Sequence, residues 1–174
     1  MNSAPPSSFV RNHIDLIREE GRVLDLACGD GRHTRMLLEK GFEVTAVDIK
    51  VDGISDISDH PGLTSLELDM EQAGNPWPLP KYLTKRFDGI IVTNYLHRPQ
   101  FPHIAASLAA EGILIYETFM IGNEKYGKPS NPSFLLREDE LIEAFESLTV
   151  LDFGQGFRDS PSPAMVQSLC ARAD

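Results

Sequence analysis

The chain contains few cysteines and few basic residues, and it has no long apolar run. Its two cysteines, Cys28 and Cys170, lack metal-ligand spacing and argue against both a metal centre and a disulfide framework. The N-terminal residues Met-Asn-Ser-Ala-Pro-Pro-Ser-Ser lack the basic-then-apolar order of a signal peptide, and no apolar segment approaches membrane-spanning length. We therefore expect a cytoplasmic protein with no bound metal and no membrane partner.

Positive charge is scarce as well, with 16 Lys and Arg against 26 Asp and Glu and a formal net charge of −10. Because nucleic-acid affinity depends on basic side chains that neutralise phosphates, we expect no nucleic-acid partner. A length of 174 residues lies within the usual range of one domain. The expected organisation is one domain over residues 1–174, as a monomer or a homodimer.

The most informative segment is residues 22–33, Arg-Val-Leu-Asp-Leu-Ala-Cys-Gly-Asp-Gly-Arg-His, followed after one predicted helix by residues 44–48. An apolar strand passes through a tight turn with Gly29 and Gly31, and a second strand stops at Asp48. Such a strand–turn–helix–strand unit binds an adenosine-containing cofactor at the carboxyl ends of its strands. The glycines let the backbone approach the ligand, and Asp48 lies where a carboxylate accepts ribose hydroxyls.

The spacing of small residues distinguishes between two cofactors. A dinucleotide fingerprint requires G-x-G-x-x-G/A, and neither a count from Ala27 nor one from Gly29 meets it. Asp25 and Asp30 add negative charge, which disfavours a pyrophosphate at a helix N-terminus. S-adenosylmethionine has no phosphate and carries a sulfonium and an ammonium group, so acidic residues suit it.

Residues Asp25, Ala27, Gly29, Gly31 and Asp48 closely resemble the first two motifs of class I S-adenosylmethionine-dependent methyltransferases. The order Asp-Leu-Ala-Cys-Gly-Asp-Gly-Arg is most similar to the small-molecule branch, which includes tellurite- and thiopurine-methylating enzymes. The resemblance departs at Ala27, where glycine is commoner. It implies a doubly wound α/β fold, Rossmann-like, with a mostly parallel seven-stranded sheet and an antiparallel last strand.

The resemblance also implies a set of residues that contact S-adenosylmethionine. It places Asp69 and the amide of Met70 beside the adenine ring, where the carboxylate accepts from the exocyclic amino group. The full expected set is Asp25, Ala27, Cys28, Gly29, Gly31, Asp48, Ile49, Asp69, Met70 and Asn94.

Apolar runs and turn residues alternate along the chain as a doubly wound domain requires. We expect a leading helix within residues 1–20. Further helices are expected at 31–40, 101–110 and 137–145, and strands at 23–27, 43–47, 64–68, 88–92, 113–119, 149–153 and 164–171.

Three residues are the expected catalytic candidates at the carboxyl edge of the sheet, where open α/β sheets bind ligands. His97 is the candidate general base because its ordinary pKa lies near neutrality, and a structural histidine is the alternative. Tyr95 forms a wall or hydrogen-bonds the substrate, or is an ordinary half-buried aromatic residue. Glu117 on the fifth strand lies near the sulfonium, or forms a salt bridge to Arg98 or a lysine.

The remaining predictions concern the acceptor side and the core. Residues 120–136 form a segment too long for an ordinary connection, and we expect it to be a substrate-side loop. Arg98 binds an anionic substrate group or forms a surface ion pair. His33 is expected to be exposed, and Trp77 to be a hydrophobic anchor beneath a proline-rich loop.

The sequence thus predicts methyl transfer from S-adenosylmethionine to a small molecule by in-line displacement, in which positioning supplies roughly 7–11 kcal/mol of barrier reduction. A nicotinamide-linked oxidoreductase on a similar fold is one alternative, and the missing third glycine disfavours it. A non-catalytic module that binds S-adenosylmethionine and regulates a partner is the other.

Overall fold

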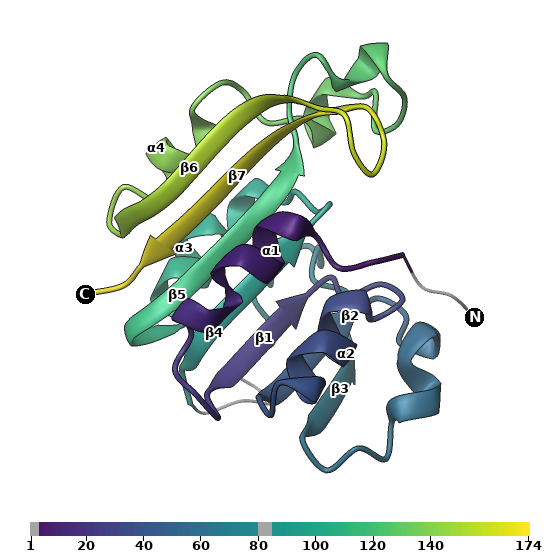
Figure 1. Cartoon of the computed structure of the whole chain (residues 1–174), viewed down its shortest axis with the longest axis vertical. Helices are drawn as coiled ribbons and strands as arrows, with labels where there is room; N and C mark the ends of the chain where they lie inside the picture. The colour runs from purple at the N-terminus through teal and green to yellow at the C-terminus, as the bar shows by residue number, and fades with distance from the viewer. Residues whose placement is uncertain (1–3, 80–84) are drawn as a thin grey trace.

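A seven-stranded sheet forms the centre of the protein (Figure 1). The computed structural model describes residues 4–79 and 85–174. Six strands run in the same direction, and only β7, which lies between β5 and β6, is antiparallel to its neighbours, which confirms the predicted sheet. In the spatial order β3-β2-β1-β4-β5-β7-β6, the strands are Leu63–Glu67, Glu43–Asp48, Arg22–Leu26, Phe87–Thr93, Leu108–Phe119, Ala164–Arg172 and Thr149–Arg158.

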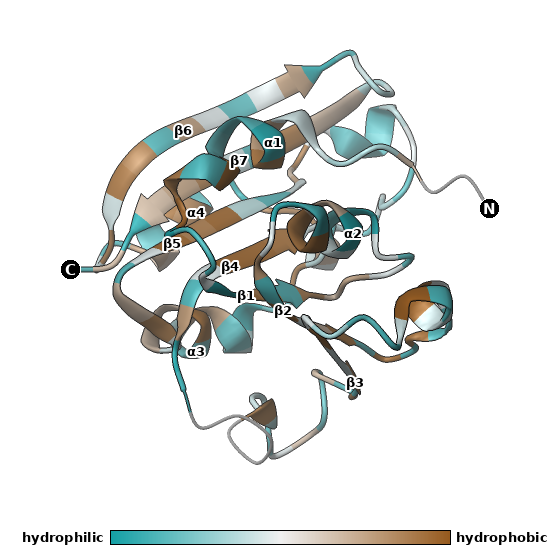
Figure 2. Ribbon diagram, turned by 60° about the horizontal axis from the view of Figure 1, so that its bottom comes forward, coloured by the Kyte–Doolittle hydropathy of each residue, from teal (hydrophilic) through white to brown (hydrophobic). Residues whose placement is uncertain are grey.

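Helices cover both faces of the sheet. α1 (Ser8–His13, continued as a 3-10 turn over Ile14–Leu16) and α2 (Arg32–Glu39) pack on one face, and α3 (Phe101–Ala106) and α4 (Glu140–Ala144) pack on the other. Successive side chains of a strand point to opposite faces, so Val23 packs with the first pair of helices and Leu24 with the second. The central strands are therefore apolar on both sides, and hydrophobic residues are frequent along β4 and β5 in Figure 2.

Several elements differ from their expected bounds for identifiable reasons. The helix expected at 101–110 ends at Ala106, because Leu108 already pairs with Phe87 at the start of β5. The pairing register then shifts before Gly89 meets Ile113, so the intervening residues bulge out of the ladder. The helix expected at 137–145 begins only at Glu140, because Asp139 has a left-handed backbone with φ 57°. β6 extends to Arg158 because it pairs with β7 along its whole length.

The segment 120–136 is tied to the rest of the protein at both ends. It contains two short 3-10 turns, Asn123–Lys125 and Pro132–Phe134. The buried Asn123 side chain donates to the Pro129 carbonyl at 3.0 Å and accepts from the Met165 amide at 3.1 Å.

Arg98 fastens the far end of the same segment. Its guanidinium donates to the carbonyls of Ser133 and Leu135, each at 2.9 Å, and forms a bidentate pair with the buried carboxylate of Glu140. The structure therefore shows an ion-pair role for Arg98, which anchors the loop.

Trp77 is buried, as predicted, and stacks on His103 with ring centroids 6.0 Å apart. Among residues 4–79 and 85–174, no helix has the length and apolar character needed to cross a bilayer.

Candidate functional site

Three cavities follow one another along the carboxyl ends of β1, β2 and β4. The first cavity, of about 440 Å³, shares Ala27, Asp48 and Tyr95 with the central cavity, of about 400 Å³. The central cavity shares Arg32 and Asn94 with the N-terminal cavity, of about 340 Å³. The first cavity is completed by Ile49, Leu68, Asp69, Met70 and Glu71. The central cavity is completed by Ala4, Cys28, Gly29, Asp30, His33 and Thr93. The N-terminal cavity is completed by residues 5–8 and 160–162 with Arg11, Glu117, Phe119 and Arg158.

The two glycines of the turn after β1 have different tasks. Gly29 has φ 57°, and a Cβ built on it meets nothing within 4 Å, so the backbone at this position faces the open central cavity. Gly31 has φ 76°, and its Cβ would lie 2.1 Å from Cγ2 of Ile54. Gly31 is therefore needed for packing, whereas Gly29 borders open space in the central cavity.

Ala27 in the same turn also has a left-handed backbone, with φ 56°. A non-glycine residue in this region costs roughly 1–2 kcal/mol. This geometry explains why glycine is the commoner residue in the motif that Ala27 resembles.

Asp48 lies at the border between the first and central cavities. Its Oδ2 accepts from the Gly29 amide at 2.9 Å, and its Oδ1 accepts from the Lys50 amide at 3.3 Å. These two bonds fix the carboxylate and leave it lone pairs for a ligand. Beside it, Ile49 is 63 % exposed, an apolar surface that a flat ring would cover.

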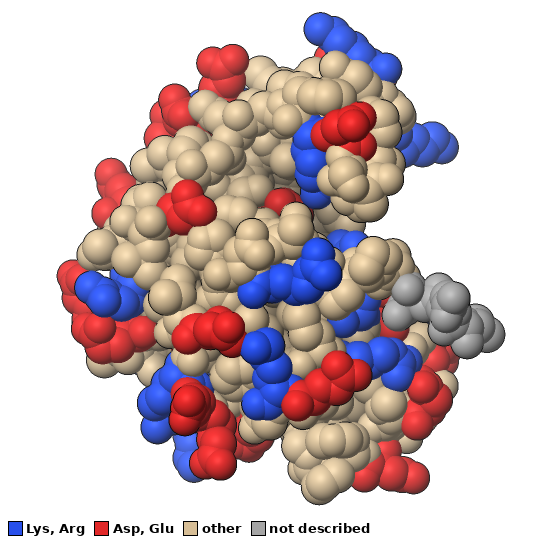
Figure 3. All heavy atoms as spheres, viewed as in Figure 1, with Lys and Arg blue, Asp and Glu red and all other residues tan. Residues whose placement is uncertain are grey.

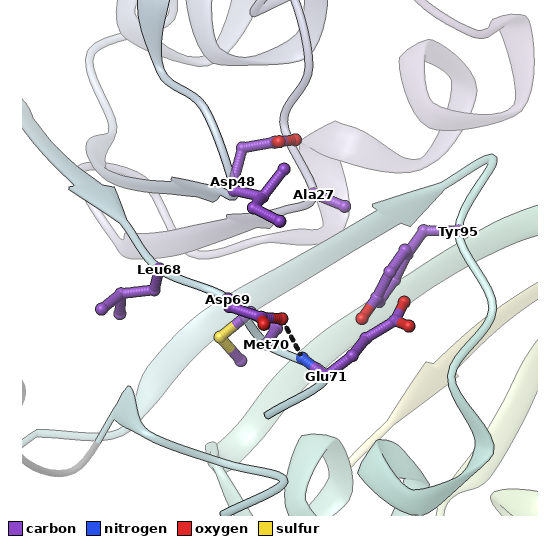
Figure 4. Close-up of a pocket in the computed structure, with 8 residues that line it drawn as sticks. Ala27, Asp48, Leu68, Asp69, Met70, Glu71 and Tyr95 are labelled. Atoms are coloured by element: carbon purple, nitrogen blue, oxygen red, sulfur yellow. Dashed lines mark hydrogen bonds between the residues drawn. The ribbon is translucent and has the colours of Figure 1, made fainter. Parts of the chain in front are cut away.

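The far wall of the first cavity is held in place by two hydrogen bonds, of which the one between Asp69 and Glu71 is drawn in Figure 4. Oδ1 of Asp69 accepts from the Glu71 amide at 2.9 Å. The buried Gln100 donates to the Met70 carbonyl at 2.6 Å, which positions the chain at this end of the cavity.

The ring of Tyr95 points toward Glu71 across the first cavity (Figure 4). Its hydroxyl is buried and has no hydrogen-bond partner among the described residues. Burial raises the pKa of Tyr95, so the phenol stays protonated and can act as a donor.

Asp25, in β1, and Cys28, in the turn that follows, are both buried. Asp25 is buried, accepts from the Thr34 hydroxyl at 2.6 Å and lines none of the three cavities. Burial raises its pKa to about 6. Cys28 lines the central cavity, and burial raises the pKa of its thiol, which therefore stays protonated.

The expectation that His33 is exposed was wrong, since only 2 % of the residue is accessible. Its Nε2 accepts from the Ser7 amide at 3.0 Å, and burial lowers its pKa to about 3, so the ring is neutral. Nδ1 therefore carries the proton and donates to Oγ1 of Thr93 at 3.4 Å. The residues before α1 cover this side of the helix, which helical spacing alone does not reveal.

Glu117 is buried at the wall of the N-terminal cavity. Its carboxylate accepts from the hydroxyls of Ser7 at 2.8 Å and Ser168 at 2.9 Å, and from the Arg158 guanidinium at 3.1 Å. Its ion-pair partner is thus Arg158, and neither Arg98 nor a lysine takes that place.

The structure separates His97 from this wall. Nδ1 of His97 lies 3.9 Å from a carboxylate oxygen of Glu71, next to the first cavity, and His97 lines none of the three cavities. This position, away from the N-terminal cavity, disfavours the predicted role of His97 as a general base. Asn94, with a left-handed φ of 54°, borders the central and N-terminal cavities.

Sequence reasoning missed the residues that form most of the N-terminal cavity. They come from residues 5–8 with Arg11 and from Arg158 with residues 160–162, and not from residues 120–136. The only local signal is Ser7, whose hydroxyl accepts from the Val10 amide as the N-cap of α1.

Residues 23–111 match the family described as Methyltransferase domain, which is just over half of the 174 residues. The chain belongs to this family. The predicted resemblance is thereby confirmed. The protein YqeM of Bacillus subtilis (strain 168), which is named as a methyltransferase, is 29 % identical over 130 residues. That alignment covers 67 % of this chain and 50 % of YqeM, so the chain spans about half the length of this relative.

Solved methyltransferase structures share the fold. TehB from Haemophilus influenzae superposes with a TM-score of 0.76 at 18 % identity, over 99 % of this chain and 64 % of TehB. The N-methyltransferase NodS from Bradyrhizobium japonicum WM9 gives a TM-score of 0.67 at 18 % identity, over 95 % of this chain and 96 % of NodS. The 1,6-didemethyltoxoflavin N1-methyltransferase of Burkholderia thailandensis, solved with bound 1,6-didemethyltoxoflavin and S-adenosylhomocysteine, gives a TM-score of 0.67 at 21 % identity, over 95 % of this chain and 76 % of that enzyme.

Proposed function

We propose that the chain transfers a methyl group from S-adenosylmethionine to a small-molecule acceptor. The observation that carries this proposal is the row of three connected cavities, in which a fixed carboxylate, Asp48, lies between the first and the central cavity. Membership of the methyltransferase family and the ligands named for structural neighbours support it.

The residues present fit this cofactor. The open space at Gly29 lies in the central cavity, where a Cβ would protrude into the room that a ligand needs. The carboxylates of Asp30 and Asp48 line that cavity and suit a ligand that carries an ammonium and a sulfonium group.

The predicted cofactor residues that line the first and central cavities then have a place in the proposal. In the first cavity, Asp48 would accept hydrogen bonds from the ribose hydroxyls, and Ile49 would cover the adenine ring. Asp69 and the Met70 amide would form hydrogen bonds with the edge of that ring. The methionyl part would lie along Ala27, Cys28 and Gly29 in the central cavity.

The bound cofactor supplies an activated methyl group, so the chain's own contribution is to hold the acceptor in line with it. Glu117 is the predicted catalytic residue at the N-terminal cavity, but its oxygens already accept three hydrogen bonds. It therefore orients Ser7 and Arg158 and is a poor proton acceptor. The neutral His33 uses both ring nitrogens in the structure. We infer that the acceptor reacts as a soft or already deprotonated nucleophile, such as a thiolate.

Mass-spectrometric detection of S-adenosylhomocysteine tests the proposed function. The purified chain is incubated with S-adenosylmethionine and a panel of thiols, phenols, amines and metalloid oxyanions. We expect acceptor-dependent product with at least one thiol. Binding of NADH in competition with S-adenosylhomocysteine would favour the oxidoreductase alternative, and cofactor binding without turnover on any acceptor would favour the regulatory module.

We propose a cytoplasmic location, since Cys28 and Cys170 are free, buried thiols, as expected in a reducing compartment. Localisation of a tagged full-length protein by fractionation tests this.

A further inference from the structure

The N-terminal cavity carries an excess of positive charge in a chain whose net charge is −10. Its lining includes three arginines, Arg11, Arg32 and Arg158, and one carboxylate, Glu117. In the space-filling view, basic side chains flank a notch (Figure 3) that lies between the N-terminal segment and the β6–β7 turn (Figure 1). The local charge is thus opposite in sign to that of the whole molecule.

Glu117 neutralises only one of the three arginines. It pairs with Arg158 at 3.1 Å. Among the described residues, no carboxylate lies within 4.0 Å of the guanidinium groups of Arg11 and Arg32, and the only side-chain hydrogen bond of Arg32 goes to the Pro5 carbonyl at 3.3 Å. Arg11 and Arg32 therefore have no ion-pair partner in the described part of the chain.

A second observation points to a ligand in the same place. Nε of Arg158 is buried and has no hydrogen-bond partner within the described chain. An unsatisfied donor of this kind is costly, and an anionic oxygen satisfies it best. Glu117 fixes the guanidinium through Nη1 and leaves the buried Nε without an acceptor.

The cavity also offers apolar surface. Its volume of about 340 Å³ is that of a site for an organic molecule, and Phe119 and three prolines, Pro5, Pro6 and Pro161, line it. An inorganic oxyanion would leave this surface uncovered.

We propose that the methyl acceptor is a small organic acid, whose anionic group binds Arg158 Nε and Arg11 and whose body packs on Phe119 and the prolines. This inference rests on the proposed function, because the central cavity would place the methyl group next to Asn94 and Arg32, which line both cavities. Arg32 contributes positive charge to both.

Calorimetric titration with a matched pair of probes, 4-hydroxybenzoate and 4-hydroxybenzamide, tests the proposal on the full chain with and without S-adenosylhomocysteine. We expect the carboxylate to bind at least about 10-fold more tightly than the amide, as a charge-assisted hydrogen bond implies. Arg11→Gln, at an exposed position, should reduce this preference about 5-fold or more and leave the affinity for S-adenosylhomocysteine within about 2-fold. Arg172→Gln is the matched control, because Arg172 pairs with Glu111 outside the cavity.

Arg158→Lys keeps the charge but removes the Nε donor, and it should also weaken carboxylate binding several-fold. If this variant does not fold, Arg11→Gln decides the question. Equal binding of the two probes, an unchanged preference in Arg11→Gln, or binding of selenite without any carboxylate would overturn the organic-acid proposal and leave the methyltransferase proposal intact. If S-adenosylhomocysteine does not bind, the methyltransferase proposal is wrong. The preference for the carboxylate probe is then still measured on the protein without S-adenosylhomocysteine.

Discussion

The amide of Ser7 donates to Nε2 of the buried His33 at 3.0 Å, across 26 positions of the chain. This bond, together with the bond from the Ser7 hydroxyl to Glu117, holds residues 4–8 against the central and N-terminal cavities. The N-terminal segment thus forms part of the site and depends on a neutral histidine for its position.

Replacing the histidine tests that dependence. His33→Leu should increase the hydrogen-exchange rate of the Ser7 amide about 5-fold, because a hydrogen bond contributes roughly 1 kcal/mol. His60→Leu is the matched control, since Nδ1 of His60 accepts from the Gly62 amide at 3.1 Å in another region. Unchanged exchange at Ser7 in His33→Leu would show that the segment is held by other contacts.

Alanine substitutions at three glycines separate effects on stability from effects on cofactor binding. Gly29→Ala and Gly41→Ala should each cost about 1 kcal/mol of unfolding free energy, because both residues have positive φ and open space at the Cβ position. Gly31→Ala should cost more, owing to its clash with Ile54. Only Gly29→Ala should weaken S-adenosylhomocysteine binding beyond its effect on stability, by about 10-fold or more, or 1.4 kcal/mol. Equal affinities of the Gly29 and Gly41 variants would remove Gly29 from the cofactor site.

Asp25 should make stability depend on pH in the acidic range. Its folded pKa of about 6 lies above the value of about 3.9 in an unfolded chain, so its stabilising contribution is complete below pH 4 and is lost as the pH rises through 6. Asp25→Asn keeps an acceptor for Thr34 and should be more stable than the wild type at pH 7.5 by up to about 3 kcal/mol, at 1.4 kcal/mol per pKa unit. Denaturant unfolding at pH 4 and pH 7.5 measures this. A difference that does not change with pH contradicts the assignment.

His97→Ala should have only a modest effect on methyl transfer, within about 5-fold, whereas loss of a general base costs about 10²–10⁴. The reason is its position beside Glu71, away from the N-terminal cavity. The pH–rate profile with the acceptor found by screening should follow the pKa of that acceptor, with His60→Ala as the control variant. A 100-fold loss of turnover with unchanged cofactor affinity would restore His97 as the base.

The sequence alone predicts the elements that are close together along the chain. The strand that ends before Ala27, the turn with Gly29 and the strand that stops at Asp48 are contiguous, and their side-chain periodicity predicts the central sheet. The position of Asp48 at the edge of the sheet can also be predicted, because this residue ends the second strand.

Contacts between residues far apart in the chain could not be predicted from the sequence. Glu117 meets Ser7 across 110 positions and Arg158 across 41. Periodicity does not show which residues cover α2, so the burial of His33 was missed. The resemblance places Asp25 at the cofactor, and periodicity does not show that its carboxylate accepts from Thr34 in the interior.

Calorimetric titration of S-adenosylhomocysteine into the wild type and Asp48→Ala tests the central claim most directly. We expect saturable binding to the wild type and a loss of about 2–4 kcal/mol in Asp48→Ala, because each hydrogen bond from a ribose hydroxyl to the carboxylate contributes about 1.5–3 kcal/mol. Asp52→Ala, in the adjacent 3-10 turn and outside the three cavities, should bind like the wild type. Absence of binding to the wild type at millimolar ligand, or equal affinity of wild type and Asp48→Ala, would contradict the account.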